Sequence, residues 1–386
     1  MGAKMNDIHV VLVANTLWSV YNFRKGLICS LIKCGHKVTI VGPNDDYAVN
    51  LRGLGCNVEF VDISSQGKNP FTDLMLIVKL KRIYDKLNPD FIFHYTIKPN
   101  IYGSIAAALS RKNSIAITTG LGFVFNKSSL FTSIIAHLYS FSLRYAKEVW
   151  FLNDDDRAVF VKKNIVDKNK TYVLDGEGVD TEFFAPIYCS DSSRTRQITF
   201  LLVARMLWDK GIGIYVDAAR QLKLEYPDVS FQLLGACDIE NPSAISRKII
   251  CDWHDEGVID YLGVTNDVRA KIAQVDCVVL PSYYREGIPR TLMEAASMGK
   301  PIITTDNVGC RNVIIDEETG FLCKIKDVAS LMGAMRRIID STSDERVVMG
   351  QRGREYICSR FDEKVIIEIY HQAIEKHLMV NDSAIN

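Results

Sequence analysis

Two glutamates and the start of a predicted helix form the strongest chemical signal in the sequence. Residues 281–301 have the pattern of a buried strand end, a turn, and a helix that begins near Arg290. Glu286 lies in the turn, and Glu294 lies one helical turn beyond Arg290. Free backbone amides at a helix N-terminus favour an anion such as a diphosphate. The segment is therefore a candidate diphosphate site with two carboxylates beside it.

The two carboxylates differ in what they can reach. Glu294, inside the helix, can accept hydrogen bonds from ribose hydroxyls, whereas Glu286 on the turn can reach a sugar. Pro289 has no amide to donate, which leaves Arg290 and Thr291 as the better amide candidates. Taken alone, each glutamate is explained by helix capping or by solvent exposure. Taken together, they favour a ligand site.

Two cations follow a second buried strand, 199–203. Arg205 and Lys210 lie in the loop after this strand, and a helix follows. Departure of a nucleoside diphosphate builds negative charge on the phosphate oxygens, and fixed cations stabilise that charge where a metal ion otherwise would. A lone arginine or lysine after a strand is usually solvated, so the inference depends on their combination with Glu286 and Glu294.

Together these four residues resemble the donor site of glycosyltransferase family four, including its Glu-x7-Glu motif. Further segments along nearly the whole chain resemble that family, namely 175–180, 307–310 and 318–321. Within the family, segments 94–100 and 119–122 are similar to enzymes that build bacterial capsule, O-antigen and glycan chains on undecaprenyl diphosphate.

The resemblance implies a GT-B fold, in which two doubly wound Rossmann-like domains face an interdomain cleft, and a retaining hexosyltransferase activity. The implied reaction moves a hexose or an N-acetylhexosamine, GalNAc or GlcNAc in preference, from a UDP-sugar to a saccharide carried on undecaprenyl diphosphate, and it forms an α-glycosidic bond. No metal and no other cofactor is expected. No nucleic acid is expected as a partner.

The same resemblance implies roles for individual residues. The implied catalytic residues are Glu286, Arg205, Lys210 and His94; the donor-binding residues are Glu294, Arg290, Thr291, Gly287 and Ile288; the acceptor-binding residues are Lys98 and Thr16. His94 ends a strand and would face the cleft, although a hydrogen-bonded core histidine is an equal alternative. Lys98 can bind an acceptor phosphate or face solvent. Family members often carry a Gly-Gly pair in the first loop, which residues 15–19 lack.

An acidic run, Asp154–Asp156, contains the Asp-x-Asp pattern that binds a metal ion in the other major glycosyltransferase fold. The run follows Asn153 and precedes a predicted helix. We therefore interpret it as a helix N-cap with acidic residues in the first turn and assign it no metal.

Short β-branched runs alternate with amphipathic helical stretches, which is typical of parallel sheets covered on both faces, so the fold class is α/β. The predicted strands are 8–14, 37–41, 58–62, 91–94, 115–118 and 148–151, then 199–203, 230–234, 258–262, 277–281 and 301–304. The predicted helices include 22–34, 72–87, 213–225, 290–297, 327–339 and 363–377. A polar linker at 188–197 separates predicted domains at 1–187 and 198–360, and the last segment, 361–386, can pack back on the first domain.

The composition bounds the class of protein. The 386 residues are 48% hydrophobic and 24% charged, which suffices for two ordinary cores and excludes a disordered chain. The ten cysteines show no CxxC pair or zinc spacing and are predicted to be buried thiols. The net charge is zero, but residues 1–150 carry 17 Lys and Arg against 9 Asp and Glu. This basic half suits an anionic acceptor, a membrane surface, or simply solubility.

No apolar stretch approaches the roughly 20 residues needed to cross a bilayer, and no signal peptide precedes the first strand. We therefore expect a cytoplasmic protein, peripheral on the inner face of the cytoplasmic membrane. Residues 125–147 are the candidate anchor on an anionic membrane surface, because their apolar positions spread wider than one core-facing stripe requires and cations lie at both ends. A buried helix of the first domain explains the same pattern.

Two other functions are compatible with the same fold. A UDP-sugar epimerase would need acid and base residues at the sugar ring, and only His94 and Glu286 offer any. A catalytically silent module would bind a nucleotide sugar within an assembly, but the combination of Arg205 and Lys210 with the two glutamates speaks against it. A dehydrogenase is disfavoured because no GxGxxG motif follows the first strand.

Overall fold

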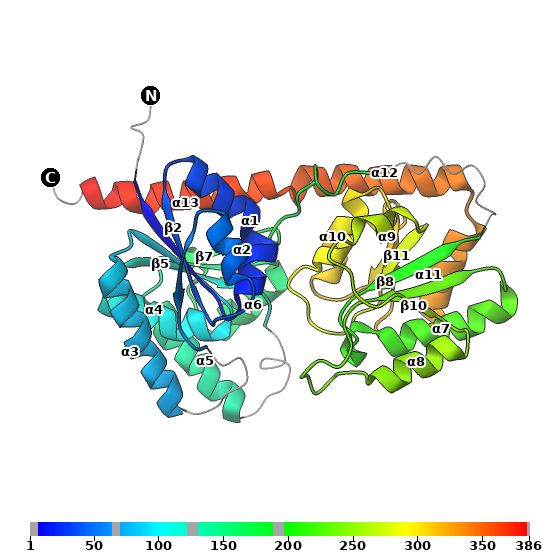
Figure 1. The fold of residues 1–386 in the computed structure, drawn as a ribbon, viewed down its shortest axis with the longest axis horizontal. Coiled ribbons are helices and arrows are strands. Elements are labelled where there is room, and N and C mark those ends of the chain that lie inside the picture. The colour runs from blue at the N-terminus through cyan, green and yellow to red at the C-terminus, as the bar shows by residue number, and fades with distance from the viewer. Residues whose placement is uncertain (1–6, 64–69, 122–129, 188–196, 384–386) are drawn as a thin grey trace. The chain divides into compact units, whose positions relative to one another are not determined.

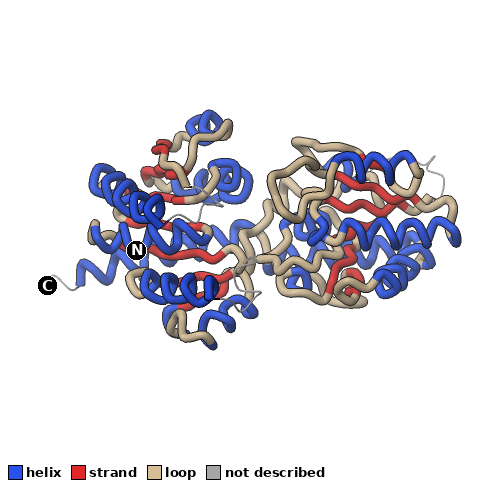
Figure 2. Tube along the Cα trace, turned by 90° about the horizontal axis from the view of Figure 1, so that it is seen from below, coloured by secondary structure: helices blue, strands red, loops and turns tan. Residues whose placement is uncertain are grey.

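The computed structural model describes residues 7–63, 70–121, 130–187 and 197–383. The chain forms two compact units, each built on one parallel sheet with helices on its faces (Figures 1 and 2). The fold class predicted from the alternation of strands and helices is therefore confirmed.

The first unit comprises Met1–Gly178 and Glu363–Asn386, and the second comprises Val179–Asp362. The division falls before residue 187, the predicted end of the first domain. The reason is that Phe184 packs into the apolar core of the second unit. The predicted linker, 188–197, lies outside the described residues except for its last position.

The first sheet has the order β3-β2-β1-β4-β5-β6-β7, and all its neighbours are parallel. Its strands are β1 (His9–Val13), β2 (Lys37–Gly42), β3 (Asn57–Phe60), β4 (Phe91–Tyr95), β5 (Asn113–Thr118), β6 (Glu148–Phe151) and β7 (Thr171–Val173). The central strands β1 and β4 are buried at every position, which explains why they are continuous apolar runs rather than alternating ones.

Helices connect these strands and cover both faces of the sheet (Figure 1). They are α1 (Leu17–Lys33), α2 (Ala48–Gly53), α3 (Pro70–Leu87), the π-helix η1 (Pro99–Gly103), α4 (Ser104–Leu109), α5 (Leu130–Leu143), α6 (Asp154–Lys162) and the short 3₁₀ helix η3 (Lys168–Lys170). Helix α4 contacts both α3 and α5, and η1 contacts the same two helices.

The C-terminal helix α13 (Glu363–Ser383) completes the core of the first unit. The Tyr370 ring lies 4.9 Å from that of Phe93 and 5.1 Å from that of Trp150. Glu148 accepts hydrogen bonds from Lys376 at 2.6 Å and from His377 at 2.9 Å. Burial alone would raise the pKa of Glu148, but these hydrogen bonds outweigh it and lower the pKa to about 2.

The second sheet has the order β10-β9-β8-β11-β12-β13, again with parallel neighbours. Its strands are β8 (Thr199–Val203), β9 (Ser230–Leu234), β10 (Asp260–Tyr261), β11 (Cys277–Leu280), β12 (Ile302–Thr305) and β13 (Gly320–Cys323). Its helices are α7 (Ile212–Glu225), α8 (Arg247–Asp255), α9 (Arg269–Ala273), α10 (Arg290–Ser297), α11 (Val328–Asp340) and α12 (Ser343–Arg360), with 3₁₀ helices η4 (Trp208–Lys210) and η5 (Cys310–Val313).

Two strands that the sequence did not predict, β7 and β13, each lie at an edge of a sheet. An edge strand needs only one hydrogen-bonded neighbour. Both are short, with three residues in β7 and four in β13. Segments this short carry little periodicity, so pairing with a neighbour that is distant in the sequence determines them.

Candidate active site

The two predicted groups of chemical residues meet at the carboxyl edge of the second sheet. Strands β8 and β11 are neighbours there, although β9 and β10 lie between them in the sequence. The chain leaves these two strands toward opposite edges, and such a switch point is where doubly wound sheets bind ligands. Arg205 and Lys210 follow β8, whereas Glu286 and Arg290 follow β11.

The loop after β8 is tied to the loop after β11 through one carbonyl group. The carbonyl oxygen of Asp209 accepts hydrogen bonds from the amides of Tyr283 and Tyr284, both at 3.0 Å, and from Ser282 Oγ at 3.2 Å. Three donors on a single acceptor fix the two loops relative to each other. The geometry of the site therefore does not depend on side-chain contacts alone.

A glycine makes this close approach of the two loops possible. Gly211 has a φ of +79°, and a Cβ atom at this position would lie 2.0 Å from the carbonyl oxygen of Pro281. Both the backbone conformation and the space exclude a larger residue. Lys210, the residue before this glycine, is thereby held against the loop after β11.

Lys210 and Glu286 form an ion pair, although 76 positions separate them in the sequence. Lys210 Nζ lies 2.5 Å from Glu286 Oε1, and Ser282 Oγ donates to the same oxygen at 2.8 Å. The two side chains are only 16% and 10% exposed, so their Coulomb attraction is weakly screened. Both contacts engage Oε1, which leaves Oε2 as the oxygen that can accept a hydrogen bond from a ligand hydroxyl.

Arg205 is the exposed cation of the site. The structure shows no ion pair for it within the described ranges, in contrast to Lys210. The charge of Arg205 acts on the buried carboxyl of Asp209, as the charge of Lys210 does. Because Lys210 is held in an ion pair, Arg205 is the more accessible of these two cations for a diphosphate.

Asp209 is a member of the site that the sequence reasoning missed. It is 5% exposed, and its Oδ1 has no hydrogen-bond partner among the described residues. Burial raises the pKa of this carboxyl; the positive charge of Lys210 opposes the rise, and the negative charge of Glu286 adds to it. Its position next to Lys210 was the only sequence signal that could have identified it.

Helix α10 begins at Arg290, as predicted, and its N-cap residue Pro289 supplies no side-chain hydrogen bond to the first turn. Arg290 Nε donates to Glu294 Oε1 at 3.0 Å. Burial raises the pKa of Glu294, and the charge of Arg290 only partly opposes this. Glu294 thus lies one turn inside the helix, largely removed from water. Thr291 follows Arg290 in the same first turn and is half-buried.

A third loop, after β12, closes around the turn that carries Glu286. Asn307 Nδ2 donates to the carbonyl oxygens of Ser282 at 3.3 Å and Tyr284 at 2.8 Å. Gly309 has a φ of +78°, and a Cβ there would lie 2.5 Å from the carbonyl oxygen of Gly287. The residues of this third loop position the turn, a role that the sequence analysis did not assign to them.

Gly287 and Ile288 were predicted to bind the donor. Gly287 packs by its carbonyl group against the loop after β12. The side chain of Ile288 packs against the apolar core of the second unit. Ile288 can therefore meet a ligand through its backbone rather than through its side chain.

The structure contradicts the expectation that His94 faces an open cleft. His94 is fully buried in the first unit, and its Nε2 lies 2.9 Å from Tyr84 Oη. Burial lowers the pKa of the imidazole to about 3, so it is neutral near pH 7. A Cβ at Gly103 would lie 2.5 Å from the ring, which shows how closely the surroundings pack. This placement is that of the core histidine that was the alternative.

Lys98 and Thr16, the predicted acceptor-binding residues, both have partners within the first unit. Lys98 Nζ lies 2.7 Å from Asp73 Oδ1, and Tyr102 Oη donates to the other oxygen of Asp73 at 2.8 Å. Thr16 caps helix α1 and accepts a hydrogen bond from Ser19 N at 3.2 Å. Each residue thus has a structural role, and a role in acceptor binding stays a prediction.

The acidic run Asp154–Asp156 opens helix α6, as predicted. Asn153 is the N-cap, and its Oδ1 accepts a hydrogen bond from Asp156 N at 2.8 Å. Within the described ranges, no group of three or more His, Cys, Asp or Glu residues is arranged to hold a metal ion.

Comparison with known proteins agrees with the fold. The family described as "Glycosyl transferases group 1" matches residues 197–341, and "Glycosyl transferase 4-like" matches residues 9–153. Together these two matches cover well over half of the chain. The match over residues 197–341 contains all the site residues that were predicted in the second unit.

Characterised relatives match over most of the chain. It is 29% identical to the Campylobacter jejuni N,N'-diacetylbacillosaminyl-diphospho-undecaprenol alpha-1,3-N-acetylgalactosaminyltransferase, covering 91% of this chain and 94% of that protein. It is 25% identical to the Escherichia coli UDP-Gal:alpha-D-GlcNAc-diphosphoundecaprenol alpha-1,3-galactosyltransferase, and this match covers 77% of this chain and 81% of that protein.

Solved structures match the fold. A glycosyltransferase from Rickettsia africae superimposes with a TM-score of 0.80 at 18% identity, covering 96% of this chain and 98% of that one. The structure of Anabaena Alr3699/HepE in complex with UDP and glucose superimposes with a TM-score of 0.77 at 18% identity. The match covers 95% of this chain and 99% of that one. The fold is therefore that of the GT-B glycosyltransferases. The chain belongs to the group 1 glycosyltransferases, the family four that its donor motif resembles.

Proposed function

We propose that this glycosyltransferase moves an N-acetylhexosamine, GalNAc or GlcNAc, from a UDP-sugar to a saccharide carried on undecaprenyl diphosphate. The new bond is an α-glycosidic bond formed with retention, and no metal ion takes part. The observation that carries the proposal is the Lys210–Glu286 ion pair at the switch point of the second sheet, next to the N-terminus of α10.

Each part of the site matches one part of a UDP-sugar. The first turn of α10 and the exposed Arg205 suit the diphosphate. Glu294, buried one turn further along the helix, suits the ribose hydroxyls. Glu286 suits the hydroxyls of the sugar through Oε2, because Oε1 is occupied by Lys210. Lys210 then lies where charge builds up on the departing diphosphate.

The proposed step is a same-face displacement. The bond between sugar C1 and the β-phosphate oxygen breaks, and its electron pair stays on the phosphate oxygen. The acceptor hydroxyl forms a new bond to C1 on the same face, and its proton passes to the departing phosphate oxygen. In this proposal no side chain forms a covalent bond to the sugar, so the protein acts by binding, orientation and charge stabilisation.

The names of the two curated relatives support the acceptor class. Both describe a saccharide on a diphospho-undecaprenol carrier and an alpha-1,3 linkage. They differ in the transferred sugar, which is N-acetylgalactosamine in one and galactose in the other. The choice of an N-acetylhexosamine follows the relative with the higher identity and the wider coverage.

A lipid-linked acceptor places the reaction at the cytoplasmic face of the membrane in this proposal. Among the described residues, no helix has both the length and the apolar character that crossing a bilayer requires. The proposed association is therefore peripheral, and anionic lipid attracts basic segments at such a surface.

The experiment that tests the function uses purified protein, a set of UDP-hexoses and UDP-N-acetylhexosamines, and a synthetic diphospholipid-linked saccharide, with products read by mass spectrometry. A transferase adds one sugar mass to the acceptor. An epimerase converts the donor and leaves the acceptor unchanged. A silent binding module changes neither, and this outcome or the epimerase outcome would overturn the proposal.

A further inference from the structure

Helix α5 contains part of the anchor predicted from the sequence. Residues 122–129 and the side chains of Leu130 and Phe131 lie outside what the structure describes. Of the described residues, Tyr139 and Leu143 are buried in the core, whereas Ile134 is 51% exposed. Helix α5 is thus in large part the core helix that was the alternative. The buried polar groups of the second unit carry more chemistry than this helix does.

Ser282 lies at the centre of the contacts that hold the turn with Glu286. Its side chain is fully buried, two residues after strand β11 ends. Its carbonyl oxygen accepts hydrogen bonds from Thr305 Oγ1 at 2.5 Å and from Asn307 Nδ2 at 3.3 Å. These two donors come from the end of β12 and the loop after it. The backbone of Ser282 is therefore fixed independently of the Glu286 side chain.

The hydroxyl group of Ser282 has one proton and two acceptors within reach. Its Oγ lies 2.8 Å from Glu286 Oε1 and 3.2 Å from the carbonyl oxygen of Asp209. That carbonyl oxygen already accepts hydrogen bonds from two backbone amides. Hydrogen bonds to a carboxylate are shorter and stronger than those to a neutral acceptor. The contact with Glu286 is therefore the stronger of the two.

A backbone amide orients the same hydroxyl group. Tyr284 N donates to Ser282 Oγ at 3.3 Å, so the serine accepts a hydrogen bond on one side and donates on the other. Adjacent hydrogen bonds polarise one another, which strengthens the donation to Glu286. The result is a short chain of hydrogen bonds that runs from the backbone of the turn to one oxygen of the carboxylate.

Ser282 and Lys210 restrain the Glu286 carboxylate in different ways. Both engage Oε1, and the last torsion of a glutamate side chain is otherwise broad. The lysine has a long, flexible stem and can follow the carboxylate when it turns. The serine hydroxyl sits one carbon from a fixed backbone and cannot. Ser282 is therefore the contact that keeps Oε1 in place.

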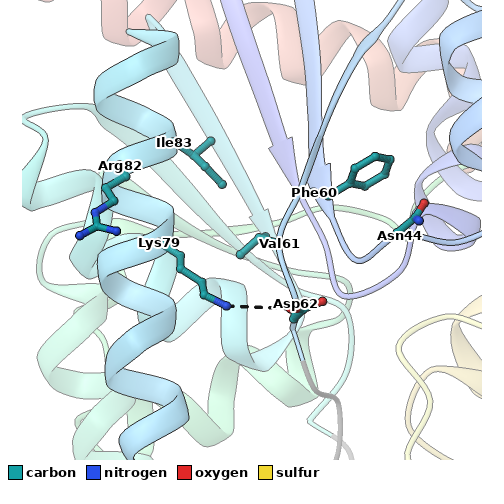
Figure 3. Close-up of a pocket in the computed structure, with 7 residues that line it drawn as sticks. All are labelled: Asn44, Phe60, Val61, Asp62, Lys79, Arg82 and Ile83. Carbon is teal, nitrogen blue, oxygen red and sulfur yellow. Dashed lines mark ion pairs between the residues drawn. The ribbon is translucent and has the colours of Figure 1, made fainter.

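An ion pair of the first unit shows the opposite case (Figure 3). Lys79 Nζ lies 3.9 Å from Asp62 Oδ2, and the two side chains are 49% and 96% exposed. Both residues line a cavity of about 350 Å³, and none of its seven lining residues carries a hydroxyl group. Water screens such a pair and does not fix its geometry. Burial and the serine hydroxyl distinguish the pair at Lys210 and Glu286.

We propose that Ser282 is the positioning residue that decides which oxygen of Glu286 faces the transferred sugar. By holding Oε1, Ser282 presents Oε2 to one hydroxyl group of the sugar. The inference rests on the proposed function, in which Glu286 contacts the sugar, and deepens it by naming the residue that sets hydroxyl recognition in the donor. Ser282 acts through Glu286 and does not itself touch the donor.

The test uses UDP-N-acetylhexosamines that lack one sugar hydroxyl group at a time. With the unaltered protein, loss of the hydroxyl that binds Oε2 is expected to lower kcat/KM by roughly tenfold to one hundredfold, because a buried acceptor is left unpaired. Ser282→Ala is expected to reduce this penalty to about threefold or less, since a carboxylate that turns freely makes poor use of that hydroxyl. With the complete donor, kcat of this variant is expected to fall by roughly tenfold.

Ser297→Ala is the matched control. Ser297 is also fully buried in the second unit, and it donates to the carbonyl oxygen of Phe184 at 2.9 Å. This variant loses the same kind of hydroxyl group, but the contacts of Ser297 in the structure are with Phe184 and Arg354 rather than with Glu286. It is expected to keep the full penalty for the deoxy donor, whatever happens to its urea unfolding. A merely structural role of Ser282 would give the result of this control.

Ser282→Cys covers the case in which the alanine variant does not fold. A thiol is a weaker donor than a hydroxyl group, so this variant is expected to reduce the penalty in the same direction and by less. In a Glu286→Ala background, Ser282→Ala is expected to lower kcat by less than about twofold, because the serine has lost the group through which it acts. An unchanged penalty in the folded Ser282 variants would overturn the inference, as would an equal reduction in Ser297→Ala.

The unaltered protein separates this inference from the proposed function. If it transfers sugar and the deoxy penalty survives Ser282→Ala, the positioning role fails and the function stands. If it transfers no sugar from any donor, the proposed function fails. Calorimetric binding of the complete and deoxy UDP-sugars then tests Ser282 directly: the inference requires a deoxy penalty in affinity that Ser282→Ala reduces and Ser297→Ala keeps, and it fails without that difference.

Discussion

Replacing Lys210 and Glu286 singly and together tests whether the ion pair acts as one unit. Lys210→Met removes a cation from beside the departing phosphate. Losing one charge-stabilising donor typically costs about 100-fold to 1,000-fold in kcat, or roughly 3–4 kcal/mol of barrier. Glu286→Gln keeps the shape of the side chain but removes the charge that holds Lys210. We expect this variant to lose kcat as well, because Lys210 then lacks its partner.

The structure also sets the expected change in stability. The side chains of Lys210 and Glu286 are 16% and 10% exposed, so the stability effect of the pair lies between two limits. An exposed ion pair contributes about 0.2–1 kcal/mol to stability. Breaking a fully buried pair costs about 3–5 kcal/mol. Lys210→Met leaves Glu286 charged and largely desolvated beside Ser282, and should lower the free energy of unfolding by about 1–3 kcal/mol. The double variant removes the stranded charge and should be more stable than the sum of the two single effects implies.

The assay is a double-mutant cycle measured twice, by urea unfolding and by kcat at saturating donor and acceptor. We expect the double variant to lose little kcat beyond Lys210→Met, since residues that act as a unit are strongly non-additive. The exposed pair Lys248–Asp252, with side chains 82% and 50% exposed, is the control and should show a coupling of only about 0.3–0.5 kcal/mol. Additive losses of kcat at Lys210 and Glu286 would refute the reasoning.

Three further predictions concern the metal, the loop contact and pH. Activity should survive EDTA, because Arg205 and Lys210 provide the charge that a metal otherwise would; strict dependence on Mg²⁺ or Mn²⁺ would contradict this. Gly211→Ala should destabilise the second unit by at least about 1–3 kcal/mol through its clash with a carbonyl oxygen and its positive φ, whereas Gly333→Ala, in open space inside α11, should stabilise by about 0.5–1 kcal/mol in urea unfolding. Glu148→Gln should cost up to roughly 3 kcal/mol at pH 7, since its pKa falls from 4.5 to about 2 and each pKa unit is worth about 1.4 kcal/mol. Because the folded-state pKa of Glu148 is lowered to about 2, its contribution is present above its ordinary value near 4.5 and is lost as the pH falls from there toward 2. Unfolding at a series of pH values should show the difference from the unaltered protein shrinking in that window.

Local pattern was enough to predict the elements that carry the donor motif. The bounds of β8 and α10 agree with the structure at both ends, because a buried apolar run and a helix start after Pro289 are signals contained in a few adjacent residues. The N-cap at Asn153 was predictable for the same reason. The edge strands of the sheets and the division of the chain at Gly178 could not be predicted from the sequence, because contacts with residues far away in the sequence determine them.

Contacts between residues far apart in the sequence also limited what could be predicted about the candidate site. The residue types at Arg205, Lys210, Glu286 and Glu294 indicated a site, but the sequence could not show that Lys210 and Glu286 pair with each other across 76 positions. The orientation of His94 was equally inaccessible. Successive side chains of a strand point to opposite faces, and when both faces are buried, as in β4, the pattern does not tell which face a histidine occupies.

The proposed reaction is retaining transfer of a sugar from a UDP-sugar to a lipid-linked saccharide. The most direct test is NMR of the anomeric proton in the product made by purified protein from an α-linked UDP-N-acetylhexosamine and a synthetic undecaprenyl-diphosphate-type acceptor. We expect the acceptor saccharide to gain one sugar whose anomeric proton has the coupling constant of an α-glycoside. A β-linked product would contradict retention, and an acceptor recovered unchanged beside an altered donor would contradict the transfer itself.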